Sequence, residues 1–125
     1  MLTARRRNDR AEDTVPDRGT AQDWTPLGAP WPAAARRDGD DVLVGGVALS
    51  HVATRFGTPV YVLDEAEVRE RCRAYRQALP DADVHYAAKA FLCGAVAEWV
   101  AAEGLGLDVC SGGELELAVT SGFPV

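Results

Sequence analysis

Lys89 is the residue most suited to covalent chemistry, because it is the only lysine in the chain and the other twelve basic residues are arginines. A lysine amine that is partly desolvated can lose its proton and form a Schiff base with a carbonyl compound, whereas a guanidinium stays charged. Lys89 follows residues 84–88, where Val84, Tyr86 and Ala88 alternate with two further residues in the pattern of a buried strand. The alternative is a surface lysine that opens a loop, since most lysines are solvated.

Asp108 is a second candidate, and it ends another short apolar stretch about twenty residues later. Strands that are parallel neighbours lie about 4.8 Å apart, so side chains at their carboxyl ends share one rim. Asp108 would then lie within reach of the same ligand as Lys89. The alternative is an acid that caps the next helix. Ser111 and Glu114 have the S-x-x-E spacing of a helix start, which favours a tight turn over a phosphate-binding loop for residues 111–113.

Alternating strands and helices must position these two residues. The pattern predicts strands at residues 58–63, 84–89 and 105–109, each followed by a helix, at about 64–79, 92–103 and 112–120. On the first helix, an apolar stripe (Val68, Cys72, Tyr75, Leu79) opposes a polar face (Glu70, Arg73, Arg76). This rhythm is typical of parallel βα units with right-handed crossovers. A complete (β/α)₈ barrel needs about 250 residues, so the units present are the beginning of one.

The first fifty residues differ in character. Residues 1–40 are rich in Arg, Asp, Pro, Gly and Ala without an apolar period, which predicts a mostly disordered tail. Within it, residues 24–32 hold two tryptophans among prolines, and they either dock as an extended strap or stay loose. Residues 41–50 predict a strand with a bend or bulge at Gly45-Gly46. Ser50 then caps a short helix over residues 51–56.

Composition excludes several classes of function. Residues 41–125 carry six basic against twelve acidic side chains and so hold the whole net charge of −6, which argues against nucleic acid and anionic membranes as partners. The three cysteines form no CxxC pattern, so we expect no metal site and a reducing cytoplasm. No apolar run approaches the roughly 20 residues of a membrane span.

The two motifs YAAKA (residues 86–90) and GLGLDVCSGGEL (residues 104–115) together resemble the pyridoxal-phosphate decarboxylases of the alanine-racemase-like fold, and among them the diaminopimelate decarboxylases. The resemblance begins near Leu43 and continues to the end of the chain. It implies an α/β fold in which residues 51–125 are the first βα units of a pyridoxal-phosphate-binding (β/α)₈ barrel. Residues 41–50 would be a strand associated with a separate C-terminal β-domain.

The same resemblance implies the site and the reaction. Lys89 would form the Schiff base with pyridoxal 5'-phosphate, and Ala87 and Asp108 would line the cofactor. The reaction implied is decarboxylation of meso-2,6-diaminopimelate, a small amino-acid substrate, to L-lysine and CO₂ by a homodimer. The family's phosphate loops, ring-nitrogen acid, substrate-binding arginine and tyrosine, and catalytic cysteine come from later residues. None of Cys72, Cys93 and Cys110 takes that cysteine's role.

Three alternatives stay open. The first is another enzyme of the same fold. An ornithine- or arginine-type decarboxylase would usually lack the double glycine present here as Gly112-Gly113. An alanine racemase would usually follow the lysine with an Asn- and Gly-rich run in place of Ala90-Phe91-Leu92. A non-catalytic pyridoxal-phosphate carrier of the same barrel family is the second. The third is an incomplete chain, inactive by itself, that stays soluble only by associating, because three βα units leave a sheet edge uncovered.

Overall fold

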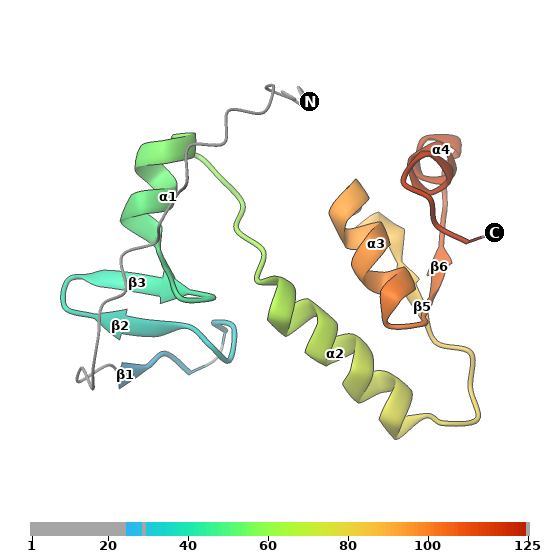
Figure 1. Ribbon diagram of the computed structural model, residues 1–125, viewed down its shortest axis with the longest axis horizontal. Helices are drawn as coiled ribbons and strands as arrows, with labels where there is room; N and C mark the ends of the chain where they lie inside the picture. The colour runs from blue at the N-terminus through green and yellow to red at the C-terminus, as the bar shows by residue number, and fades with distance from the viewer. Residues whose placement is uncertain (1–24, 29, 125) are drawn as a thin grey trace.

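The structure is a computed structural model that describes residues 25–28 and 30–124. Its elements, in chain order, are β1 (Thr25–Pro26), β2 (Arg36–Asp38), β3 (Asp41–Val44), β4 (Val47–Ala48), α1 (Leu49–Phe56), α2 (Glu65–Ala78), β5 (His85–Ala87), the 3₁₀ turn η1 (Ala88–Ala90), α3 (Gly94–Ala102), β6 (Gly106–Asp108) and α4 (Gly112–Thr120). In Figure 1 the antiparallel strands and α1 lie on one side of α2, whereas α3, α4 and the pair β5–β6 lie on the other.

An antiparallel sheet of order β1-β2-β3-β4 precedes the βα units. Strand β2 pairs along β3, with Arg36 opposite Leu43 and Asp38 opposite Asp41, and thereby covers an edge that would otherwise leave backbone groups unpaired. Regular secondary structure is therefore present before residue 41, the boundary expected from composition. The rest of the expected tail, residues 1–24, lies outside the described residues.

The junction between β3 and β4 is a two-residue hairpin turn rather than a bend within one strand. Gly45 and Gly46 have φ angles of 57° and 81°, the positive values that such turns require at both central positions. The predicted cap at Ser50 is wrong, because α1 begins at Leu49 after Ala48. Ser50 instead donates its hydroxyl to the carboxylate of Asp41, which ties α1 to β3.

The strand predicted over residues 58–63 is also wrong. Residues 58–64 run as an extended connection between α1 and α2 and pair with no strand of the described part of the chain. Tyr61 is 95% exposed, and Val60, Val62 and Leu63 are exposed as well. The local sequence has strand character, but a strand needs a neighbour for its backbone groups, and none is present among the described residues.

Helix α2 begins after a side-chain cap at Asp64. The carboxylate of Asp64 accepts hydrogen bonds from the amides of Ala66 and Glu67, at 2.9 and 3.3 Å. Only the first half of its predicted apolar stripe is covered, because Cys72 is buried whereas Tyr75 and Leu79 are 61% and 49% exposed. Burial raises the pKa of the Cys72 thiol, which therefore packs as a neutral group.

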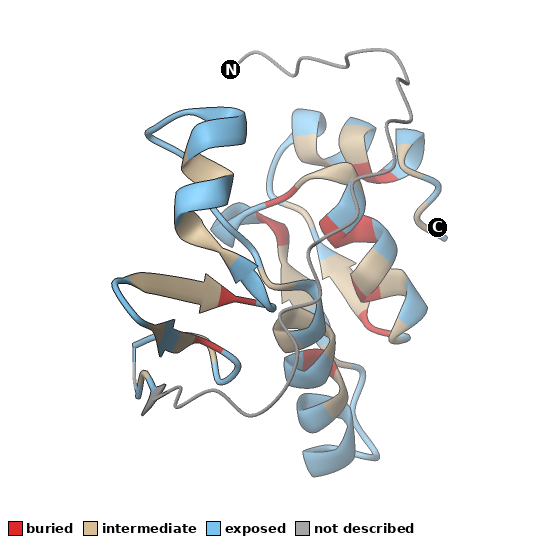
Figure 2. Cartoon of the chain, turned by 60° about the vertical axis from the view of Figure 1, so that its left-hand side comes forward, coloured by how far each residue is buried: buried red, intermediate tan, exposed pale blue. Residues whose placement is uncertain are grey.

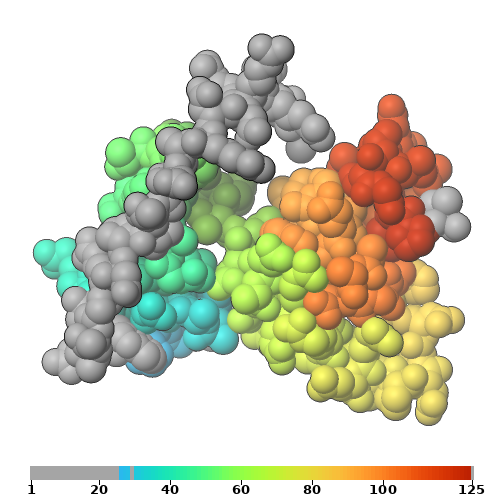
Figure 3. Space-filling model, viewed as in Figure 1, coloured from blue at the N-terminus to red at the C-terminus, as the bar shows by residue number. Residues whose placement is uncertain are grey.

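The core lies around α3, as the buried positions in Figure 2 show. Val96, Ala97 and Val100 on this helix are at most 2% exposed. They cluster with four residues from neighbouring elements: Cys72, Ala88, Leu92 and Leu105. Helix α3 packs on α2, β6 and α4, and in Figure 3 its atoms lie between those of α2 and α4. Among the described residues, no helix is long and apolar enough to cross a membrane.

Candidate functional site at the carboxyl ends of β5 and β6

Strands β5 and β6 are parallel neighbours, as the sequence predicted. Their register places His85 opposite Gly106, Tyr86 opposite Leu107 and Ala87 opposite Asp108. Two of the three predicted site residues, Ala87 and Asp108, are thus paired at the last position of each strand. The carboxyl ends of both strands open at the same edge, which is where βα proteins carry their ligands.

Lys89 lies two residues beyond this pair, in the turn η1 rather than at the end of the strand. The residue before it, Ala88, is 2% exposed and belongs to the core cluster, whereas Lys89 itself is exposed. Within the described part of the chain, the Lys89 amine makes no ion pair or hydrogen bond. The turn therefore anchors the backbone at Ala88 and presents the next side chain to the exterior.

Tyr86, on strand β5, stabilises this turn through a hydrogen bond. Its hydroxyl donates a hydrogen bond of 2.7 Å to the backbone carbonyl of Phe91, the residue that follows η1. Burial raises the pKa of Tyr86, with smaller contributions from the Cys72 and Cys93 thiols, so the phenol is protonated at neutral pH. The sequence placed Tyr86 on the strand but gave no signal for this bond, which depends on the path of the turn.

The segment after Asp108 is a helix start. The amide of Glu114 donates to the Ser111 hydroxyl at 3.2 Å, as the S-x-x-E spacing predicted. In a capping box the Glu114 carboxylate would accept a second hydrogen bond from the amide of Ser111. Here it accepts instead from the amide of the preceding residue, Cys110, at 2.7 Å. This arrangement favours the tight turn over a phosphate loop. Asp108 is exposed and does not cap α4, and it has no side-chain partner among the described residues.

The amino ends of β5 and β6 carry a different arrangement, centred on Glu103 at the end of α3. Its carboxylate accepts from Arg69 at 3.1 Å and from Arg73 at 3.0 Å, while its backbone carbonyl accepts from Arg76 at 2.7 Å. The hydrogen bond from Arg69 is the largest cause that lowers the pKa of Glu103, and Arg73 adds to it. The sequence pattern places Arg73 and Arg76 on the polar face of α2 and gives no partner for them. The i, i+4, i+7 spacing of the three arginines was the available signal.

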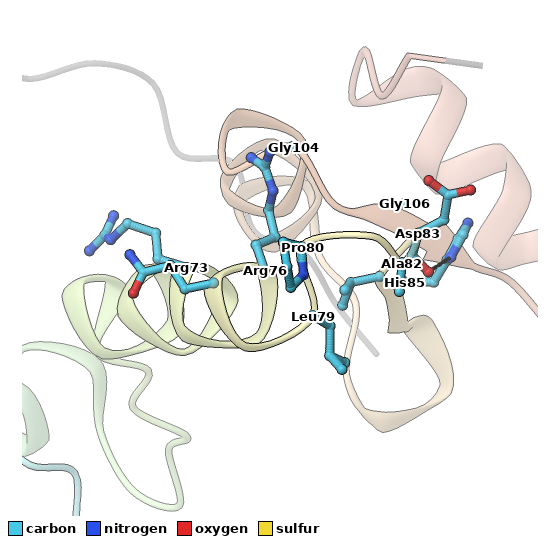
Figure 4. Close-up of a pocket in the computed structure, with 11 residues that line it drawn as sticks. Arg73, Arg76, Leu79, Pro80, Ala82, Asp83, His85, Gly104 and Gly106 are labelled. Carbon is cyan, nitrogen blue, oxygen red and sulfur yellow. Dashed lines mark hydrogen bonds between the residues drawn. The ribbon is translucent and has the colours of Figure 1, made fainter.

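A cleft of about 650 Å³ opens at this amino end, between the last turn of α2 and the starts of both strands. Figure 4 shows Arg76 extending from α2 toward Gly104, with His85 and Asp83 on the strand side. None of the predicted site residues lines this cleft. Its arginines are engaged by Glu103, so it is a structural junction remote from Lys89.

The carboxyl-end rim combines an exposed amine with an exposed carboxylate at neighbouring strand ends. A cofactor with a carbonyl group fits the free Lys89 amine, and the small Ala87 side chain leaves room beside it. The loops that follow β5 and β6, residues 88–93 and 109–111, contain no arginine and no second lysine. A phosphate group would therefore need backbone amides or other parts of the protein. Among the described residues, no group of three or more His, Cys, Asp and Glu side chains could hold a metal ion.

Comparison with known proteins agrees with this geometry. Residues 65–125 match the family described as pyridoxal-dependent decarboxylase, pyridoxal binding domain. The chain is similar to proteins named diaminopimelate decarboxylase, with 54% identity over 94 residues to that of Actinosynnema pretiosum and 49% over 96 residues to that of Mycobacterium tuberculosis. In both cases the match covers 75% of this chain and 22% of the relative.

A solved structure shares the fold. The crystal structure of AQ1208 from Aquifex aeolicus superposes with a TM-score of 0.68 at 39% sequence identity, covering 72% of this chain and 23% of that one. The chain spans about a fifth of the length of the curated relatives it matches. The resemblance inferred from the two motifs is confirmed, because residues 65–125 match the pyridoxal-binding domain of the pyridoxal-dependent decarboxylases.

Proposed function

We propose that this chain is the N-terminal part of a pyridoxal-phosphate-dependent decarboxylase that converts meso-2,6-diaminopimelate to L-lysine and CO₂. The observation that carries the proposal is the 54% identity to a diaminopimelate decarboxylase over a segment that places Lys89 just beyond a parallel strand end. In this proposal, residues 51–125 begin a (β/α)₈ barrel, and residues 41–50 associate with a separate β-domain. The whole protein is a cytoplasmic homodimer, and the 125-residue chain alone is inactive.

Each rim residue has a role in the proposal. Lys89 would supply the amine that holds the cofactor covalently. Asp108, one strand away, favours the protonated form of nearby groups through its charge. Ala87 offers a small side chain against which the cofactor ring can lie. When bound, pyridoxal phosphate supplies the carbonyl for the lysine and a ring that takes up the electrons left by CO₂.

The test uses a completed protein, in which this whole chain is followed by the part of the Actinosynnema relative that lies beyond the matched segment. We expect it to release CO₂ from meso-diaminopimelate in preference to ornithine or arginine. The matched control is Lys89→Arg, which keeps the positive charge but removes the nucleophilic amine. Preferred decarboxylation of ornithine or arginine would contradict the substrate assignment. Cofactor binding without any decarboxylation would favour the non-catalytic carrier.

A further inference from the structure

The turn that carries Lys89 is bracketed by one side-chain hydrogen bond. The Tyr86 hydroxyl lies before the turn and the Phe91 carbonyl after it, and the 2.7 Å bond between them spans residues 87–90. Within the described part of the chain, no other side-chain hydrogen bond reaches residues 87–91. This bond therefore determines how the two ends of the turn are held together.

The turn has few other means of holding its shape. Its residues other than Lys89 are alanines, and Ala87, at the N-cap position of η1, provides no side-chain hydrogen bond. The methyl group of Ala88 fixes one point by packing in the core. The Tyr86 ring packs against the same core cluster, so its hydroxyl is offered to Phe91 from a fixed position. Beside the backbone bonds of the 3₁₀ turn itself, one apolar anchor and one side-chain hydrogen bond thus hold the path of the backbone.

The direction of Lys89 depends on that path alone. Its side chain is exposed and has no partner among the described residues, so no contact of its own orients the amine. Loss of the Tyr86 hydroxyl would free the segment after Ala88 to move, and the amine would move with it. A loosely placed nucleophile reacts more slowly, because fewer encounters have the productive geometry.

We infer that Tyr86 is a positioning residue for Lys89: its hydroxyl, bonded to the carbonyl of Phe91, fixes the turn so that the amine meets a carbonyl cofactor. This inference rests on the proposed function. Tyr86 touches no cofactor in this account, since its hydroxyl is used by the backbone. Its effect is on how fast Lys89 reacts rather than on how tightly the cofactor is held.

The experiment compares Tyr86→Phe with the completed wild-type protein. Pyridoxal phosphate is added at saturating concentration, samples are reduced with borohydride at intervals, and the pyridoxyl group on Lys89 is measured by peptide mass spectrometry. We expect Tyr86→Phe to slow labelling of Lys89 by about three- to tenfold, the range expected for one hydrogen bond. The cofactor concentration for half-maximal labelling should stay the same. Tyr75→Phe is the matched control, because Tyr75 is 61% exposed on α2 and its hydroxyl has no partner among the described residues.

A second measurement separates positioning from general stability. Hydrogen exchange of the amides of residues 88–92 should be faster in Tyr86→Phe than in wild type or Tyr75→Phe, while the melting temperature of the protein changes little. An unchanged labelling rate, or a lowered melting temperature without slower labelling, would overturn the inference. A wild-type completed protein that never becomes labelled at Lys89 would refute the proposed function itself, and the inference would fall with it.

Discussion

The two ends of the β5–β6 pair are built in opposite ways. At the amino end, Glu103 is held by Arg69, Arg73 and Arg76, and the His85 ring lies tightly over Gly106, where an added Cβ atom would approach His85 Cδ2 to 2.2 Å. At the carboxyl end, Lys89 and Asp108 are exposed and have no partners within the described residues. The charged side chains of the amino end are thus used in structural bonds, whereas those of Lys89 and Asp108 are not.

This difference indicates that the two ends of the strand pair have separate roles, one in chemistry and one in stability. In βα proteins, conserved chemistry lies at the carboxyl ends of the strands and stability at the amino ends. Here the same division is visible within two strands of three residues each. Substitutions at the carboxyl end should therefore change chemistry without changing stability, and those at the amino end should do the reverse.

The largest expected effect is the loss of decarboxylase activity from a substitution at the carboxyl end. Lys89→Arg in the completed protein should abolish decarboxylation, because the guanidinium cannot act as an amine nucleophile. The melting temperature should stay close to that of wild type, because Lys89 is exposed and makes no hydrogen bond or ion pair with another described residue. Activity assays and thermal unfolding monitored by circular dichroism check the two halves of this prediction. Retained activity would exclude Lys89 as the essential amine.

Gly104→Ala, at the amino end, should lower the free energy of unfolding. Gly104 has a φ of 73°, and a Cβ there would lie 2.7 Å from Nη1 of Arg76. The left-handed conformation alone costs a residue with a Cβ about 1–2 kcal/mol. We expect a loss of at least about 1 kcal/mol in the free energy of unfolding in urea. The matched control is Gly113→Ala on α4, where a Cβ meets nothing within 4 Å and should raise stability by about 0.5 kcal/mol. Equal effects of the two substitutions would contradict this account.

Glu103→Gln should weaken the amino end in a pH-dependent way. The pKa of Glu103 is lowered in the folded state, chiefly by the hydrogen bond from Arg69. Its carboxylate therefore stabilises the fold fully above the unfolded glutamate pKa of about 4.3, and this contribution is lost as the pH falls through the lower folded value. The melting temperature of Glu103→Gln should lie below that of wild type at pH 7, and the gap should close in acid.

The control for this measurement is Glu98→Gln on the same helix, because Glu98 is exposed and its carboxylate has no partner among the described residues. Its melting temperature should follow that of wild type at every pH. A gap between wild type and Glu103→Gln that widens toward acid would have the wrong sign for this network.

The smallest expected effect sharpens the comparison at the carboxyl end. Asp108→Asn should change the free energy of unfolding by less than about 0.5 kcal/mol, as is usual for exposed side chains without partners. In the completed protein it should nevertheless speed the labelling of Lys89 by pyridoxal phosphate, because the lost carboxylate charge no longer favours the protonated form of nearby groups. A destabilised Asp108→Asn protein with unchanged labelling would reverse the assignment of this end.

Local patterns predicted the parts of the fold that depend on neighbouring residues. The helix start at Ser111 follows from short-range spacing, and the alternation of strands and helices indicated that β5 and β6 are parallel. The strand expected at residues 58–63 did not form, because pairing depends on a partner that lies elsewhere. The same reason explains why composition alone missed β1 and β2, because β1 pairs with β2 and β2 pairs with β3.

The site shows the same limit. The strand pattern predicted that Lys89 and Asp108 share one rim, whereas the register pairs Asp108 with Ala87 and Lys89 lies in the turn just beyond. It could not find the Glu103 network or the Tyr86 bond to Phe91, since both join groups whose separation is set by tertiary packing. The roles of Lys89, Ala87 and Asp108 toward the cofactor remain predictions.

The most direct test of the central claim is to map where pyridoxal phosphate becomes attached. The completed protein is incubated with the cofactor, reduced with borohydride and digested, and the labelled peptides are identified beside those of Lys89→Arg. The account predicts a label on the peptide that contains Lys89, retained after dialysis and absent from the variant. A label confined to other amines, with Lys89 unmodified in a folded protein, would contradict the claim that the carboxyl end of β5 carries the reactive lysine.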